Sequence, residues 1–212
     1  MLPRVTVALG RLPQLMSLLR RLMNRNMLLH DQLDTLAACG IAPHERSGLP
    51  DLLRRHPERD YETSPFKLLL TELGREPSDP PHEPMSDNVW LMHADCVARG
   101  GDYVKIAHRM STLAAGALPL ENVRDEFDLR RGVAHLTFTL HGRDLLWPAK
   151  IEERWIDPNI LSRFAALLEA QDTDLRYICL DLGGQDCLLA CATGEQFASL
   201  RKITGLAFEW LG

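Results

Sequence analysis

The chain has 212 residues, of which 45% are hydrophobic, enough to bury the core of one large domain or two small ones. Asp and Glu outnumber Lys and Arg by 29 to 24. This acidic balance argues against general nucleic-acid binding, which depends on a cationic surface. The five cysteines lack the spacing of a disulfide framework, and arginines interrupt the apolar amino terminus, so we expect a cytoplasmic protein without a signal peptide or membrane span.

A long amphipathic helix is predicted over residues 13–38. Its leucines recur three and four positions apart, so they form one face, with Asn26 as the only polar position in that seam. The simplest expectation is that this face packs on later helices of the same chain. A homodimer through paired copies of the helix, with Asn26 setting the register, stays open. The broad leucine-rich face and the acidic remainder of the chain argue against a membrane-surface helix.

Two further helices are predicted before residue 76. One spans Pro50 to Arg55, and the other starts at Pro65, after the capping residue Ser64, and ends at Gly74. Four prolines then fall within residues 77–86, and neither a helix nor a central strand tolerates them. We therefore divide the chain into a helical region, 1–76, a proline-rich linker, 77–86, and an α+β domain, 87–212.

Two helices are predicted at the start of the α+β domain. Asp87 can cap one that carries Trp90 and ends at Gly100. Asp102 begins the second, and Pro119 prevents it from continuing. The short turn between them predicts an antiparallel or angled helix pair.

From Val133 the hydrophobic period changes from about four residues to two, which is typical of strands. A hairpin is predicted over 133–151, a helix from Asp157 and Pro158, and a second hairpin over 175–192. A capping box of Thr193 and Gln196 then opens a last helix, and a strand is predicted over 206–211. The predicted fold class is α+β: a helical N-terminal half followed by a small antiparallel sheet of two hairpins with two packed helices.

Candidates for metal binding or catalysis are few. His93 and Cys96 lie three residues apart on a predicted helix, a spacing that can present two ligands to zinc, but no matched second pair follows. Neither a Gly-x-Ser-x-Gly elbow nor a Gly-rich phosphate loop is present. We therefore expect no metal site, no cofactor and no catalytic residues. An enzyme of unrecognised type, built on the polar cluster His93, Asp95 and Cys96, is the alternative.

Acidic and aromatic residues gather around the ends of the predicted hairpins. Acidic loops are usually solvated surface, and most tryptophans belong to the core. As a docking surface for a basic protein, however, such carboxylates need no burial, and tryptophans are frequent anchors of interfaces. The candidate partner-binding residues are Glu121, Asp125, Glu126, Asp128, Trp147, Glu152, Glu153 and Trp155.

Several features of residues 133–211 resemble one kind of bacterial protein. They are the first hairpin, the Trp155-Ile156-Asp157 helix start, the turn at 183–186 and the cap formed by Thr193 and Gln196. Together they resemble immunity proteins that neutralise polymorphic or secretion-system toxins. The resemblance implies a cytoplasmic, non-catalytic inhibitor that occludes a toxin, expected here to be a basic domain, and it assigns no individual residues. An adaptor or assembly factor that acts through the helix at 13–38 is a further alternative.

Overall fold

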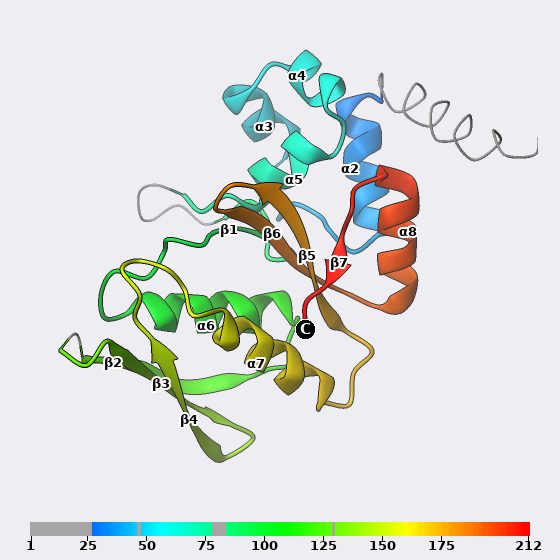
Figure 1. Cartoon of the computed structure of the whole chain (residues 1–212). Coiled ribbons are helices and arrows are strands. Elements are labelled where there is room, and N and C mark those ends of the chain that lie inside the picture. Colours follow the sequence, from blue (N-terminus) through cyan, green and yellow to red (C-terminus); the bar gives the residue numbers. More distant parts are fainter. Residues whose placement is uncertain (1–26, 46–47, 78–83, 129) are drawn as a thin grey trace, which may run out of the picture.

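The structure is a computed structural model that describes residues 27–45, 48–77, 84–128 and 130–212 (Figure 1). Of the helix predicted over 13–38, residues 13–26 lie outside the described residues. The rest forms α2, Leu29–Ala38, in which Leu29 and Leu36 are buried in the core of the same chain. The homodimer through 13–38 stays a prediction.

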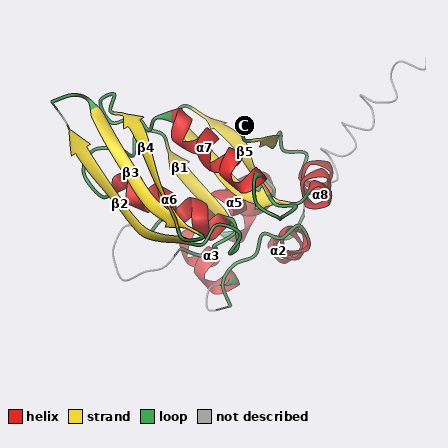
Figure 2. Ribbon diagram, turned by 90° about the horizontal axis from the view of Figure 1, so that it is seen from below, coloured by secondary structure: helices red, strands yellow, loops and turns green. Residues whose placement is uncertain are grey.

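Layers of helices and strands alternate through the fold (Figures 1 and 2). The α+β class is confirmed, and the strands form two antiparallel sheets. The four-stranded sheet consists, in spatial order, of β1 (Val89–His93), β6 (Asp186–Ala192), β5 (Arg176–Gly183) and β7 (Glu209–Trp210). The three-stranded sheet consists, in order, of β2 (Leu120–Asp128), β3 (Val133–Leu140) and β4 (Arg143–Lys150).

The helices fall into two groups around the four-stranded sheet. Between the two sheets lie α6 (Asp102–Leu113) and α7 (Pro158–Glu169) (Figure 1). The opposite face of the four-stranded sheet is covered by α2 together with α3 (Leu49–Arg55), α4 (Glu58–Thr63), α5 (Lys67–Gly74) and α8 (Gly194–Thr204). Among the described helices, none has both the length and the hydropathy needed to cross a bilayer.

The two predicted hairpins and the caps of the helices that follow them are confirmed. Strands β3 and β4 meet at a two-residue turn, His141-Gly142, where both φ angles are positive, as a primed hairpin turn requires. Asp157 caps α7 by accepting a hydrogen bond from the Asn159 N–H at 3.0 Å. Thr193 and Gln196 form the predicted capping box of α8.

The prediction of a helix that starts at Asp87 is wrong, and so is the prediction of a helix pair. Residues Val89–His93 form β1, which pairs antiparallel with β6, and only α6 of the expected pair is present. The reason is burial on both faces: Val89 and Leu91 face the N-terminal helices, while Trp90 and Met92 face α6 and α7. Such a strand is apolar throughout, so its sequence lacks the period of two that marks a half-buried strand.

No strand is predicted before Val133, but residues Leu120–Asp128 form β2, the first strand of the three-stranded sheet. It pairs with β3 over most of its length, and a bulge interrupts the register between Glu121 and Arg124. Three smaller differences occur elsewhere. Helix α4 was not predicted, α5 begins at Lys67 because Phe66 has φ +66°, and β7 covers only part of 206–211.

The N-terminal helices and the four-stranded sheet share one hydrophobic core, whose members come from α2 through α5, β1, β5, β6 and α8. Gly74 marks their closest approach. A Cβ atom added there would lie 2.7 Å from the backbone nitrogen of Leu91, so only glycine allows α5 to pack directly on β1. The predicted linker is described only at residues 77 and 84–86.

Candidate partner-binding surface

One face of the three-stranded sheet packs on α6 and α7, and no described helix or strand covers the other (Figure 2). The inner side chains of β3 are Ala134, Leu136, Phe138 and Leu140, all buried. Because side chains alternate along a strand, the residues between these point to the opposite side of the sheet, which we call the outer sheet face. Its cross-strand rows are Glu121–Thr139–Asp144, Arg124–Thr137–Leu146, Glu126–His135–Pro148 and Asp128–Val133–Lys150.

A large apolar side chain stands in the middle of this polar face. Leu146 is 61% exposed, the highest value among the large hydrophobic residues that the structure describes. It lines an open hollow of about 350 Å³ together with Arg124, Thr137 and Asp144. Exposed apolar surface rimmed by polar groups is the usual composition of a protein-binding site.

Hydrogen bonds hold the polar side chains around Leu146 in place. Arg124 donates from Nε to Oγ1 of Thr137 at 3.0 Å. The hydroxyl of Thr139 donates to Oδ1 of Asp144 at 2.7 Å and accepts from the side-chain amide of Asn122 at 3.2 Å. A surface organised in this way loses little conformational entropy when a partner binds.

Three of the predicted residues lie in the turn between β4 and α7. Glu152 and Trp155 form an isolated β-bridge across the turn, and Glu153 at its tip has φ +56°, an uncommon conformation for a residue other than glycine. Trp155 is 41% exposed. It lines a hollow of about 190 Å³ with Glu152 and Lys150, and Lys150 also belongs to the outer sheet face, so the turn adjoins that face.

Two of the eight predicted residues point inward instead. Asp125 accepts hydrogen bonds from the backbone N–H groups of Gly101 at 2.7 Å and Tyr103 at 3.0 Å, and so caps the start of α6. Trp147 packs edge-on against Phe138 and Phe164, with ring centroids 4.8 and 4.9 Å apart. Both side chains stabilise the fold, whereas Glu121, Glu126 and Asp128 lie on the outer sheet face.

The enzyme alternative relied on His93, Asp95 and Cys96 lying together on a predicted helix. The structure places none of the three on a helix. His93 ends β1 and contacts Asp186, with Nδ1 2.5 Å from Oδ1. Cys96 lies in the following turn, packed against the core, and burial raises the pKa of its thiol to about 11. A thiol with that pKa is protonated near neutral pH and is a poor nucleophile. Neither hollow described above is lined by His93, Asp95 or Cys96.

Metal-ligand side chains are equally dispersed. In the part of the chain that the structure describes, no three His, Cys, Asp or Glu side chains gather in a way that would hold a metal ion. The zinc-binding spacing of His93 and Cys96 requires a helix, whereas His93 ends β1 and Cys96 lies in the turn that follows.

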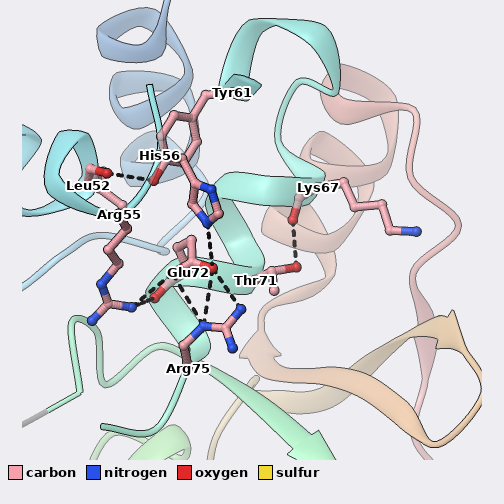
Figure 3. A network of polar contacts seen from close by, with 8 residues as sticks. All are labelled: Leu52, Arg55, His56, Tyr61, Lys67, Thr71, Glu72 and Arg75. Carbon is pink, nitrogen blue, oxygen red and sulfur yellow. Dashed lines mark hydrogen bonds and ion pairs between the residues drawn. The ribbon is translucent and has the colours of Figure 1, made fainter. Parts of the chain in front are cut away.

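A buried carboxylate that sequence analysis missed organises the N-terminal helices (Figure 3). Glu72 on α5 is 2% exposed and contacts Arg75 at 2.8 Å, Arg55 at 2.9 Å and His56 at 3.3 Å. Burial raises the pKa of this carboxyl, but the hydrogen bonds from Arg75 and Arg55 outweigh burial and leave the pKa lowered. Glu72 is thus held as an anion that links α3 to α5. In the sequence, only its pairing with Arg75 can be recognised, as an i, i+3 spacing.

A second missed residue, Arg109 on α6, closes the free edge of β1. Its Nη2 donates to the carbonyl of Val89 at 3.2 Å, and its guanidinium lies 6.0 Å from the Trp90 ring centroid. Its Nε forms an ion pair with Oε1 of Glu76 at 2.8 Å, but the Nε–H does not point at that oxygen and makes no hydrogen bond to a described residue. The arginine therefore joins α6, β1 and Glu76, the residue before the linker, and its role is structural.

The outer sheet face, with the adjoining turn at 152–155, is accordingly a surface that no described helix or strand covers. Its open hollow and its exposed leucine distinguish it from the cores on either side of the four-stranded sheet. Comparison with known proteins adds no assignment, because no family model, curated protein or solved structure matches the chain.

Proposed function

We propose that the protein is a non-catalytic binding protein that holds a basic protein partner on its outer sheet face. The observation that carries the proposal is Leu146, which is 61% exposed at the centre of a sheet face lined by hydrogen-bonded polar side chains. Protein interfaces combine an apolar centre, which loses its contact with water on binding, with a polar rim around it. Leu146 and its surroundings match that pattern.

Charge on the outer sheet face favours a cationic partner. The four rows contain the acids Glu121, Glu126, Asp128 and Asp144 and the bases Arg124 and Lys150, so acids exceed bases by two. Exposed arginines follow at 130 and 131, after β2, and at 154, after β4, so the excess of acids applies to the four rows and does not extend into these loops. Complementary charge raises the rate of association and penalises partners of the wrong sign.

The kind of partner follows from the resemblance to immunity proteins. We take the partner to be a toxin with a basic domain, and the protein to be its cytoplasmic inhibitor, acting by covering the toxin's active site. Inhibition of this kind needs a firm surface and no reactive group. A paired antiparallel sheet with hydrogen-bonded side chains provides such a surface, because little must be ordered on binding.

Co-expression with the product of a neighbouring toxin gene tests the proposal. We expect growth rescue and a complex that survives gel filtration. Leu146→Asp, which places a charge at the centre of the outer sheet face, should abolish both. Leu53→Asp is the matched control, since Leu53 is 40% exposed on α3, on the other side of the molecule. Failure of the unaltered chain to form a complex or to rescue growth would overturn the proposal.

A further inference from the structure

Strand β4 lies at the edge of the three-stranded sheet, so alternate residues direct their backbone N–H and C=O groups away from β3. Lys150 shows which residues these are. Its N–H donates to Oδ2 of Asp157 at 2.9 Å, and its C=O accepts from the Tyr103 hydroxyl at 3.3 Å. By the same alternation, the residues of β4 whose backbone groups point away from β3 are Lys150, Pro148, Leu146 and Asp144.

Half of this edge is closed to a further strand. Both backbone groups of Lys150 are occupied, as just described. Pro148 has no N–H to donate, and its C=O accepts from Nη1 of Arg163 at 3.1 Å. Proline and covering side chains are the usual means by which proteins block the edges of sheets.

The other half of the edge is open. Among the described residues, none outside the β3–β4 hairpin hydrogen bonds to the backbone of Asp144 or Leu146. Each therefore presents one free donor and one free acceptor. The open half coincides with Leu146 and with the hollow on the outer sheet face.

We propose that the open edge at Asp144 and Leu146 binds an extended segment of the protein partner, which adds a fourth strand beside β4. This inference rests on the proposed function, because it specifies which part of the protein partner contacts the sheet. Main-chain hydrogen bonds give affinity in such strand addition, and alternate side chains give specificity. Because Pro148 and Lys150 close the remainder of the edge, the added strand pairs only with the 143–147 half of β4.

The side chains of Asp144 and Leu146 define the sequence of that segment. Both lie on the outer face and are two residues apart, so they meet alternate residues of a neighbouring strand about 4.8 Å away. The segment places a lysine or arginine beside Asp144 and an apolar residue beside Leu146. A second copy of β4 fits poorly, because it would bring Asp144 against leucine or against another aspartate.

Synthetic peptides provide the test. The probe is a fluorescent ten-residue peptide in which leucine and lysine stand two positions apart among threonines, and binding to the full chain is followed by anisotropy. Leu146→Pro removes one outward N–H without breaking the β3–β4 ladder, and Leu146→Ala removes the side chain but keeps the N–H. We expect Leu146→Pro to bind about tenfold more weakly than Leu146→Ala, because it leaves a peptide carbonyl unpaired.

The outcomes separate this inference from the proposed function. Equal binding by Leu146→Pro and Leu146→Ala, with both variants folded by circular dichroism, would overturn strand addition. So would failure of the peptide to bind while the toxin complex still forms, and in that case the proposed function stands. If Leu146→Pro proves unfolded, a peptide N-methylated at the paired positions, which should not bind the unaltered chain, replaces it. A dimer of the free protein that Leu146→Pro dissolves would assign the edge to a second copy and reject the partner segment.

Discussion

Asp125 and Gly101 are joined by a hydrogen bond of 2.7 Å from the backbone N–H of Gly101 to the carboxylate, so a strand residue caps the start of α6. The same carboxylate accepts from the N–H of Tyr103 at 3.0 Å. It therefore satisfies two donors that the first turn of a helix leaves unpaired, and its negative charge is favourable at that end of the helix. The cap fixes α6 against the three-stranded sheet from its inner side.

We predict that Asp125→Ala lowers the free energy of unfolding by about 1 to 2 kcal/mol, the usual effect of losing a helix cap. Urea denaturation followed by circular dichroism measures this. Glu126→Ala is the matched control, because Glu126 is the exposed neighbour on the outer sheet face and should change the stability by less than about 0.5 kcal/mol. An Asp125→Ala variant as stable as Glu126→Ala would contradict the role of Asp125 as a cap.

Gly74 offers a test of the contact between α5 and β1. Gly74→Ala places a methyl group 2.7 Å from the Leu91 nitrogen, a backbone atom that cannot move aside without shifting the strand. We expect a loss of about 1 to 3 kcal/mol, as for other overpacked sites. Gly100→Ala is the control, since its added Cβ would meet nothing closer than 3.9 Å and its φ is not positive. Thermal unfolding of the two variants should differ clearly, and equal midpoints would argue against the close approach.

The buried carboxylate of Glu72 makes stability depend on pH. Its pKa is lowered in the folded protein because the hydrogen bonds from Arg75 and Arg55 outweigh burial. A depressed folded pKa means that this stabilisation is present above the unfolded value, for which 4.5 is the reference, and is lost as pH falls through the folded pKa. We predict that Glu72→Gln costs about 2 kcal/mol near neutral pH and much less in acid.

Denaturation at several pH values measures this difference. Glu58→Gln, on the exposed surface of α4, serves as the control and should shift the whole stability curve very little. If the difference between the unaltered protein and Glu72→Gln stayed constant from neutral to acid pH, the ionised state of Glu72 would not be the source of its contribution.

Local sequence signals predicted the parts of the fold that depend on neighbouring residues. The β3–β4 hairpin followed from strict alternation, and α8 followed from its capping box. The misses share a different cause, because they depend on distant contacts. Strand β1 is apolar on both faces because two layers cover it, and β2 carries Asp125 where an apolar inward residue would have revealed a strand.

The candidate surface was accessible to sequence reasoning only in part. Acidic residues such as Glu121 and Glu126 were identified from composition, and the structure places them on the outer sheet face. Leu146 was not singled out, because Leu145, Leu146 and Trp147 read as one apolar run. Which of the three points outward depends on the register with β3, where Leu146 pairs with Thr137. Trp147, conversely, was identified as an anchor but is partly buried and packs against the core.

Trp155 provides the last prediction, on the extent of the binding surface. It is 41% exposed and lines the hollow next to Lys150, at the end of the outer sheet face. Trp210 is equally exposed, at 41%, but belongs to the other sheet and packs against Phe197 of α8, with ring centroids 4.0 Å apart. If the partner extends onto the turn, Trp155→Ala should weaken the complex by about 2 kcal/mol, as a tryptophan hot spot does.

Isothermal titration of the partner with both variants measures this. Trp210→Ala should bind like the unaltered chain, since β7 lies on the four-stranded sheet, away from the outer sheet face. Equal affinity of both variants would confine the interface to the sheet rows around Leu146 and exclude the turn. A loss of affinity with Trp210→Ala alone would move the interface to the four-stranded sheet, to which β7 belongs.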